Sequence, residues 1–161
     1  MMFKKTYSIL AMGVVLIMIG SRFASLSAEK FSVEYLNSPA NKSLGLPFSE
    51  AVRVGNMLYL AGQVGNTPGK LELVPGGIRA EAKQAMENMK AILERNGSSL
   101  DHVVKCTVFL ADMKEWPVFN EVYRSFFSSH FPARSSLGTT GLAIGARVEI
   151  ECIAVVPSKK K

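Results

Sequence analysis

A few charged residues, among them Arg134 and Glu149, interrupt an otherwise apolar C-terminal segment, "FPARSSLGTTGLAIGARVEIECIAVV". Arg134 stands at the start of one strand-like run, and Glu149 lies inside the next. A guanidinium is a rigid fork that binds a carboxylate through two hydrogen bonds, so Arg134 could hold a small organic acid. A carboxylate one strand away could orient or deprotonate a water molecule. The alternative is an interface ion pair between Arg134 and a glutamate, and the spacing alone favours neither.

Residues for several other chemistries are missing or badly spaced. The chain has no G-x-S-x-G segment for an acyl-transfer serine. The segment "GNTPGK" has the wrong glycine spacing for a phosphate loop and no Ser or Thr after its lysine. His102 and His130 are isolated, which favours surface or capping roles. Trp116 and the aromatic pair at 126–127 lie on or beside an amphipathic helix, so we expect them to pack in the core.

The elements that would position Arg134 and Glu149 can be read from the hydrophobic pattern. Alternation on both sides of Gly55-Asn56 predicts a hairpin over 49–64, after an extended lead-in over 29–47. Helical spacing predicts helices over 78–96 and 114–131. Strand-like runs cover 103–112, 133–142 and 146–156. The order β-β-α-β-α-β-β predicts an α+β fold with two helices on one face of a mixed sheet.

The residues of the last predicted strand indicate what covers the other face of that sheet. Alternate residues from Val148 to Val156 are apolar and suit burial under helices. The opposite set contains Glu149 and Glu151 but also Ile153 and Val155, which is too apolar for open water. We therefore expect subunits to associate through this face, with the glutamates near a subunit boundary.

The N-terminus has the order of a secretory signal peptide. Lys4 and Lys5 precede an uncharged run over 9–20, and small residues follow near Ala28. The run is shorter than the roughly 20 residues that a transmembrane helix needs, so an uncleaved anchor is the alternative. We expect residues 1–28 to be removed, which leaves a single domain over 29–161. Cleavage lowers the net charge from +6 to +3, and no clustered basic face is visible, so nucleic acid is not an expected partner.

The two cysteines, Cys106 and Cys152, both lie in strand-like runs. No histidine stands at ligand spacing from them, so they do not indicate a zinc site. A buried thiol packs as a small hydrophobic group. We expect free buried thiols, with a disulfide only if the two strands lie side by side.

Residues 44–157 resemble the Rid family of reactive intermediate deaminases, also called the YjgF family, almost end to end. The matching text includes "AVRVGNMLYLAGQVG", "DHVVKCTVFLADM" and above all "PARS" followed by "VEIECIAV". The RidA branch of this family contains 2-iminobutanoate/2-iminopropanoate deaminases. The resemblance implies a chorismate-mutase-like fold and a homotrimer, with sheets lining its centre and three clefts between subunits.

The resemblance also assigns roles to residues of this chain. Arg134 matches the carboxylate-binding arginine, and Glu149 matches the glutamate that positions water. Gly62 in "LAGQ" would contribute backbone at the cleft, and Asn120 in "FNEVY" would support the site. Glu151 shares a face with Glu149, but we expect a structural role for it.

Three positions depart from the pattern of the RidA branch. Phe48 in "LPF" replaces a tyrosine whose hydroxyl faces the substrate, so it can wall the pocket but cannot donate a hydrogen bond. Ala61 stands where many members have serine, and Ser136 stands where some have cysteine. Phe48 and Ser136 remain expected substrate contacts. The departures bear on substrate preference and rate, whereas the Arg134 anchor is retained.

The expected activity is hydrolysis of small 2-imino or 2-enamino acids to 2-keto acids and ammonia, without a metal or organic cofactor. The alternative is a non-catalytic exported protein that binds small carboxylates or keto acids in the same cleft. A ribonuclease activity ranks last, because no general-base histidine supports it. The signal peptide predicts an exported, periplasmic protein that contacts membrane only through that segment if it stays uncleaved.

Overall fold

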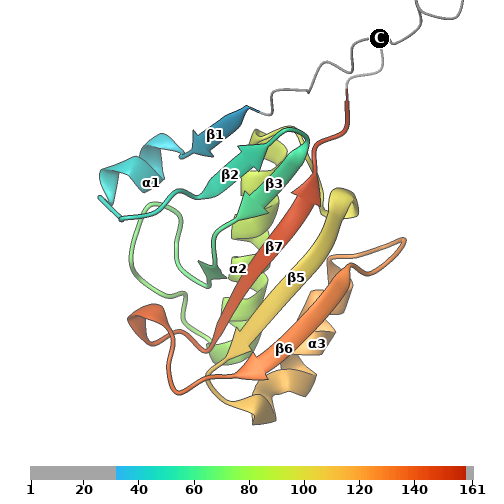
Figure 1. Cartoon of the computed structure of the whole chain (residues 1–161). Helices are drawn as coiled ribbons and strands as arrows, with labels where there is room; N and C mark the ends of the chain where they lie inside the picture. Colours follow the sequence, from blue (N-terminus) through green and yellow to red (C-terminus); the bar gives the residue numbers. More distant parts are fainter. Residues whose placement is uncertain (1–31, 159–161) are drawn as a thin grey trace, which may run out of the picture. The chain divides into compact units, whose positions relative to one another are not determined.

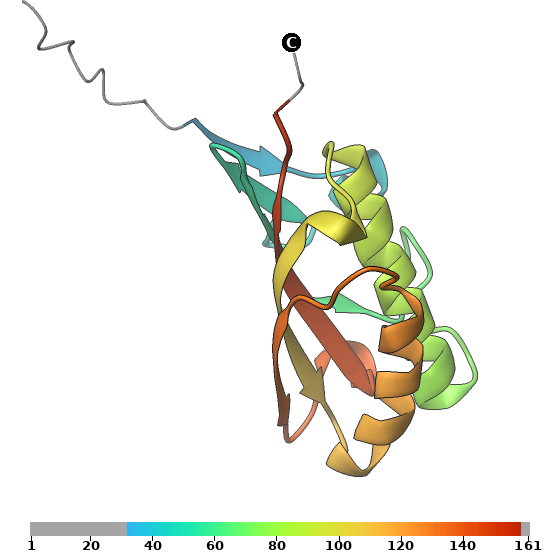
Figure 2. The ribbon, with the colours of Figure 1, turned by 90° about the vertical axis from the view of Figure 1, so that its right-hand side faces the viewer.

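A mixed β-sheet with two longer helices on one face forms the framework of the protein (Figures 1 and 2). The structure is a computed structural model that describes residues 32–158. The predicted signal peptide, residues 1–28, lies outside the described residues. The strands are β1 (Val33–Leu36), β2 (Ala51–Val54), β3 (Met57–Leu60), β4 (Gln63–Val64), β5 (Val103–Leu110), β6 (Ala133–Gly138) and β7 (Val148–Val155). The helices are α1 (Pro39–Ser43), α2 (Gly77–Arg95) and α3 (Trp116–Ser125), with 3-10 turns η1 (Leu100–His102), η2 (Met113–Glu115) and η3 (Ala143–Gly145).

The sheet has the strand order β1-β2-β3-β7-β5-β6, and β4 pairs with the start of β7. The β5–β6 pair is parallel, because α3 forms the crossover between them, and the other pairs are antiparallel. Figure 2 shows the sheet edge-on, with α2 and α3 on the same side. This arrangement agrees with the predicted α+β layers.

The predicted hairpin and first long helix are confirmed. Val54 pairs with Met57 across the Gly55-Asn56 turn, and Gly55 has a φ of 59°, a conformation that glycine adopts without a steric penalty. The helix predicted over 78–96 spans Gly77–Arg95. Its apolar stripe packs on the sheet, with Ala85, Met86 and Met89 fully buried.

Three predicted boundaries were wrong. The lead-in contains β1 and α1, and α1 begins where Ser38 accepts a hydrogen bond from the Asn41 N–H ahead of Pro39. The helix predicted over 114–131 starts with η2, and α3 ends at Ser125. The strand predicted over 133–142 ends at Gly138.

The prediction of free thiols was also wrong, because Cys106 and Cys152 form a disulfide. The two strands are antiparallel neighbours, and their register places Cys106 directly opposite Cys152, with a Cα–Cα distance of 4.2 Å. Directly opposed residues approach this closely at the non-hydrogen-bonded positions of an antiparallel pair. Strand pairing, which the sequence left open, therefore decides the state of the cysteines.

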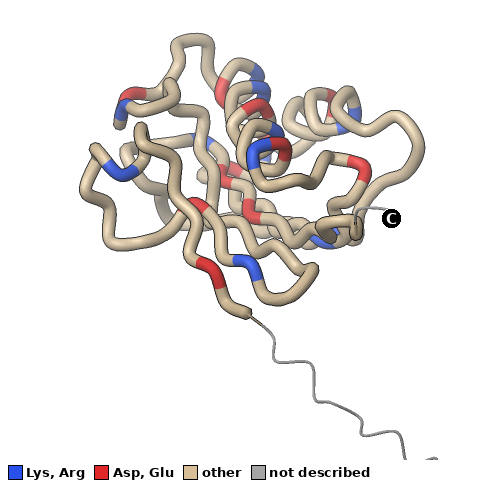
Figure 3. The backbone as a smooth tube through the Cα atoms, turned by 90° about the horizontal axis from the view of Figure 1, so that it is seen from above, with Lys and Arg blue, Asp and Glu red and all other residues tan. Residues whose placement is uncertain are grey.

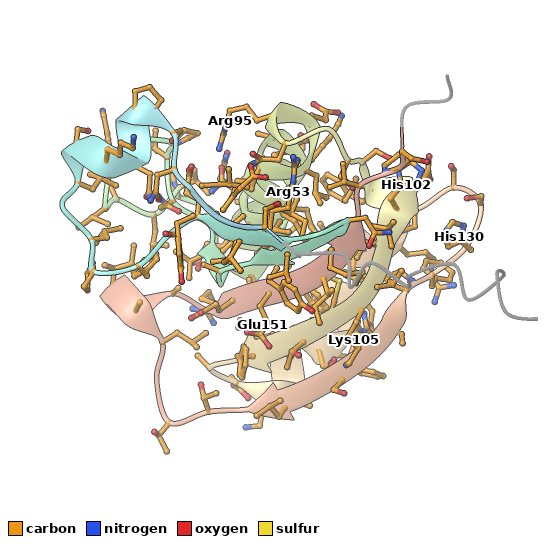
Figure 4. All side chains as sticks on the ribbon, turned by 45° about the horizontal axis from the view of Figure 1, so that its top comes forward. Arg53, Arg95, His102, Lys105, His130 and Glu151 are labelled. Atoms are coloured by element: carbon orange, nitrogen blue, oxygen red, sulfur yellow. A yellow bond between two sulfur atoms is a disulfide. The ribbon has the colours of Figure 1, made fainter. Side chains whose placement is uncertain are left out.

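The sheet face opposite α2 and α3 is open in the single chain. Val33, Tyr35 and Tyr59 are exposed there on neighbouring strands. Glu151 and Lys105 project from the same face, as their labels in Figure 4 show. Among the described residues, no helix is both long and apolar enough to cross a bilayer.

Candidate active site

Arg134 lies on β6, and its side chain is on the side of the sheet that α3 covers. In the register it stands opposite the buried Cys106. Its Nη2 donates a hydrogen bond of 2.7 Å to Oδ1 of Asn120. The guanidinium carbon lies 4.5 Å from the ring centroid of Tyr123 and 5.6 Å from that of Phe119, which are cation–π distances. The side chain is therefore held from two directions by α3.

One stripe of α3 forms the wall of the pocket around Arg134. Trp116, Asn120, Tyr123 and Arg124 line this cavity of 380 Å³, and their spacing places them on one helix face. Trp116 is 39% exposed, so the prediction that it packs in the core was wrong. It instead lines the Arg134 pocket.

The Tyr123 hydroxyl is buried beside Arg134 and has no hydrogen-bond partner within residues 32–158. Burial raises the pKa of Tyr123 to about 12, and the nearby positive charge of Arg134 offsets part of this rise. The hydroxyl therefore stays neutral at physiological pH. Arg134 forms no ion pair in the described part of the chain, so its remaining N–H groups are available to an anion.

Glu149 lies on β7 and points away from the helices, because its neighbours Val148 and Ile150 are fully buried on the helix side. A hydrogen bond just before β7 fixes the start of the strand, two residues ahead of Glu149. The backbone N–H of Arg147 donates this hydrogen bond, of 2.8 Å, to the carboxylate of the buried Glu81 in α2. Burial raises the pKa of Glu149, and the like charge of Glu151 raises it further. A carboxylate with a raised pKa is a better proton acceptor than an ordinary surface glutamate.

Gly62 is packed directly against the Glu149 carboxylate. A Cβ atom at Gly62 would collide with Oε1, Cδ and Cγ of Glu149. Phe48 and Ala61 lie in the same pocket, which has a volume of 680 Å³. The absence of a side chain at Gly62 therefore creates the space that the Glu149 carboxylate occupies.

The structure places the predicted site residues in two separate groups. Glu149, Gly62 and Phe48 line the larger pocket, whereas Arg134 and Asn120 line the smaller one. Arg134 and Glu149 point to opposite faces of the sheet. Ser136 shares the helix-side face of β6 with Arg134 but lines neither pocket. A single chain therefore does not bring Arg134 and Glu149 together.

Sequence reasoning missed Tyr123 and Ile144. Tyr123 could have been found from Asn120, because residues three and four apart share a helix face. Ile144 lines the larger pocket and has a φ of 52°, which is strained for a β-branched residue. The hydrophobic pattern carries no signal for that conformation.

Within residues 32–158, no three His, Cys, Asp or Glu side chains come together as a metal site requires. His102 and His130 lie apart from Glu151 in Figure 4, and each contacts a neighbouring serine, Ser99 or Ser129. Acidic and basic residues alternate along the helices (Figure 3).

Comparisons with known proteins show which family the chain belongs to. Residues 40–156 match the family model described as endoribonuclease L-PSP. The chain is 47% identical over 110 residues to a 2-iminobutanoate/2-iminopropanoate deaminase of Dermatophagoides farinae, covering 68% of this chain and 86% of that protein. Its fold is similar to that of YyfA of Yersinia pestis, a protein of unknown function in the conserved Rid family. That TM-score is 0.72 at 32% identity, over 78% of this chain and all of the other.

A second solved structure is also similar to this chain. It is TdcF of E. coli with bound serine, with a TM-score of 0.63 at 33% identity, over 68% of this chain and 88% of that one. The match of the family model to most of the chain and the identity to the deaminase point to the same group of proteins. This chain therefore belongs to the endoribonuclease L-PSP family, the Rid or YjgF family that its "PARS" and "VEIECIAV" segments resemble.

Proposed function

We propose that the protein hydrolyses 2-imino or 2-enamino acids to 2-keto acids and ammonia. The observation that carries this proposal is Arg134, a guanidinium fixed by Asn120 and Tyr123 and free of any carboxylate within residues 32–158. Such a group is ready to bind the carboxylate of a small acid through two charge-assisted hydrogen bonds. The relatives that are 2-iminobutanoate/2-iminopropanoate deaminases support the same chemistry.

Glu149 acts as the general base in this proposal. Its raised pKa lets it accept a proton from a water molecule as the water attacks C2 of the imine. The C=N π electrons then move to nitrogen, which takes up the proton that Glu149 accepted, so that a C2 bearing OH and NH2 results. The hydroxyl proton then passes through Glu149 to this nitrogen as the C–N bond breaks, which releases the keto acid and ammonia and leaves Glu149 ionised. Imine hydrolysis is intrinsically easy, so placement of water and substrate supplies much of the rate.

The catalytic pair belongs to a cleft between subunits in this proposal. Arg134 and Glu149 point to opposite sheet faces of one chain, so they meet only if Arg134 of one subunit approaches Glu149 of the next. The open sheet face supports a homotrimer, because exposed Tyr35, Tyr59 and Leu137 would be covered by neighbouring copies.

We also propose that the protein is exported to the periplasm. Residues 1–28 have the order of a signal peptide. The Cys106–Cys152 disulfide supports an oxidising compartment, because cytosolic thiols are kept reduced. The supply of imines outside the cytoplasm would then require an exported amino-acid oxidase or dehydrogenase.

A non-catalytic binder is the second candidate. Phe48 lines the Glu149 pocket without the hydroxyl that RidA-branch members carry at this position, which removes one possible proton donor. Arg134 would serve a binder equally well. Ribonuclease activity is outside the proposal, because the described site offers a carboxylate and a guanidinium and no histidine.

The proposal is tested by keto-acid and ammonia release from freshly generated 2-imino acids. Arg134→Ala removes two hydrogen bonds to a charged group, so kcat/KM should fall by about a hundredfold or more. Glu149→Gln should lower kcat by about a hundredfold or more while binding of keto acids persists. A folded wild-type protein without acceleration would exclude the enzyme and leave the binder.

Mixing the two variants tests the subunit arrangement. If each cleft takes Arg134 from one subunit and Glu149 from the next, random trimers of Arg134→Ala and Glu149→Gln regain about a quarter of the wild-type activity. Subunits must be unfolded and refolded together so that they exchange. A mixture that stays as inactive as either variant alone would show that the two residues do not act across an interface.

A further inference from the structure

The pocket beside Glu149 is larger than a three- or four-carbon acid requires. Its volume is 680 Å³, in the middle of the range for pockets that hold drug-sized molecules. Gly62 and Glu149 line it together with a stripe of α2 that contains Asn88, Ala91 and Ile92, and the part lined by α2 is called the inner pocket here. Because α2 covers the side of the sheet opposite the open face, the inner part of the pocket is not where a docked sheet face would lie.

Apolar side chains form the rim of this pocket. Phe48 is 51% exposed, Leu71 is 54% exposed and Ile144 is 44% exposed, although all three are large hydrophobic residues. They come from the loop before β2, the loop after β4 and η3, so three separate segments converge on one apolar rim. Ile144 is held there in a strained backbone conformation, with a φ of 52° and a ψ of 19°. Strained residues cluster at ligand sites more than elsewhere.

The polar side chains in the inner part are already satisfied by the protein. Nδ2 of Asn88 donates to the Val64 and Asn66 carbonyls, at 3.1 and 3.0 Å. The side-chain amide of Asn88 also accepts from Gln84, at 2.8 Å. Nε2 of Gln63 donates to backbone carbonyls next to it. These amides therefore line the pocket without a free donor aimed at a ligand.

The charged groups at the far end are also paired with each other. Arg95, which Figure 4 labels beside α2, donates to Glu50 at 3.1 Å. Glu50 also accepts from the Ser38 N–H and hydroxyl at the start of α1. Glu149 is the polar lining side chain without a hydrogen bond in the described residues. The inner pocket therefore favours an apolar group over a second carboxylate or an amide.

We infer that this inner pocket takes the side chain of the substrate, and that the preferred substrates are 2-imino acids with a branched or aromatic apolar side chain of about four or more carbon atoms. Imines that arise from leucine, methionine or phenylalanine have this chemistry. The inference rests on the proposed deaminase function. It predicts that burial of the longer side chain beside Ile92 and Phe48 adds affinity that a methyl or ethyl group cannot supply.

The test compares imines generated in place by an L-amino-acid oxidase from alanine, leucine and phenylalanine, with an amine trap to measure competing decay. Wild-type kcat/KM should be about tenfold or more higher for the leucine and phenylalanine products than for the alanine product. Ala91→Phe fills the inner pocket from an exposed position of α2. It should lower the leucine value by about tenfold and leave the alanine value within about twofold.

The control is Glu94→Phe, which adds the same ring at an exposed position of α2 outside the pocket. It should change neither value. Equal rates on all three imines, or an equal loss on all three in Ala91→Phe, would overturn the inference. The affinities for pyruvate and 4-methyl-2-oxopentanoate, measured by calorimetry, test the pocket preference independently of the proposed deaminase activity. Tighter binding of the longer keto acid by a protein that does not hydrolyse imines would exclude the deaminase function but support the preference of the pocket for longer apolar side chains.

Discussion

At the scale of single residues, Gly62 and Gly65 lie on either side of β4 and are both closely packed, but against different partners. A Cβ at Gly62 would meet the end of the flexible Glu149 side chain. A Cβ at Gly65 would meet the backbone of Glu81 in α2. A side chain can rotate away from an added methyl group, whereas a packed helix backbone cannot. The first glycine therefore serves the site, and the second serves the fold.

Alanine at each position should separate these roles. Gly65→Ala should lower the free energy of unfolding by about 1–3 kcal/mol, because the methyl group overpacks β4 against α2. Gly62→Ala should change it by less than about 1 kcal/mol. It should nevertheless lower kcat by tenfold or more, on the order expected for a displaced base. Thermal unfolding and steady-state kinetics on both variants check this, and an active, stable Gly62→Ala protein would contradict it.

The raised pKa of Glu149 predicts both a pH profile and a stability effect. Burial and Glu151 raise this pKa, so the ionised carboxylate destabilises the fold at neutral pH. Glu149→Gln should therefore be more stable than wild type above the folded-state pKa. This advantage should vanish as the pH falls below the unfolded value of about 4.3. Chemical unfolding at several pH values measures it.

The same pKa should set the acid limb of kcat/KM. Activity should decrease as the pH falls through the raised pKa, because protonated Glu149 cannot accept a proton. Glu151→Gln removes one cause of the rise, so the limb should move to lower pH. Glu121→Gln, which breaks an exposed pair with Arg79 on the helices, is the control and should leave the limb unchanged. If the acid limb stays at the same pH in Glu151→Gln, ionisation of Glu149 is not what sets it.

At the scale of elements, α3 positions Arg134. Asn120 supplies a hydrogen bond, and Tyr123 and Phe119 supply aromatic faces, all from a helix that the parallel β5–β6 crossover places over β6. Tyr123 also packs against Phe127, with ring centroids 4.8 Å apart. The aromatic row of α3 therefore fixes the helix to the core and holds the guanidinium.

Two substitutions of Tyr123 distinguish its ring from its hydroxyl. Tyr123→Phe keeps the ring and removes a buried hydroxyl that has no partner in the described residues. It should leave activity near wild type and stabilise the fold by up to about 1 kcal/mol. Tyr123→Leu removes the cation–π contact and should raise KM by about fivefold or more with a smaller change in kcat. Kinetics well below both melting temperatures check this, and equal KM values in the two variants would contradict it.

At the scale of the whole molecule, the disulfide connects the central strands β5 and β7. The disulfide closes a loop over a sequence separation of 46 residues. One of its two cysteines, Cys106, lies opposite Arg134 in the strand register. Cross-linking restricts the unfolded chain, and in the chain-entropy account a loop of this length contributes about 4 kcal/mol. The bond therefore stabilises the sheet that carries both Arg134 and Glu149.

Reduction of the disulfide should lower the melting temperature of the protein. Cys106→Ala/Cys152→Ala should be destabilised by about 2–4 kcal/mol and should not respond to reductant. The wild type in reductant should approach the variant's stability. Differential scanning calorimetry with and without reductant measures both. A wild type whose unfolding is insensitive to reductant, with the thiols shown to be reduced, would contradict the prediction.

Local sequence patterns were enough to predict the α+β class, the hairpin at Gly55-Asn56, the long helix and the residues of β7 that face the helices. These features follow from local periodicity and turn chemistry, which neighbouring residues largely decide. The sequence also singled out Arg134 and Glu149 as candidates, because charged residues in apolar strands are unusual, and the roles that the family resemblance implies for them stay predictions. The boundaries of α3 and β6 were not predicted correctly, since helix and strand ends depend on contacts with other elements.

Tertiary structure decided the matters that depend on which strands are neighbours. The register between β5 and β7 joined the two cysteines that the sequence left as free thiols. The packing of α3 brought Tyr123 onto Arg134 and left Trp116 partly exposed in the lining of the Arg134 pocket. The convergence of three loops made an apolar rim next to Glu149. Contacts between segments far apart in the chain leave no period in the sequence, so these features appear only when the chain is folded.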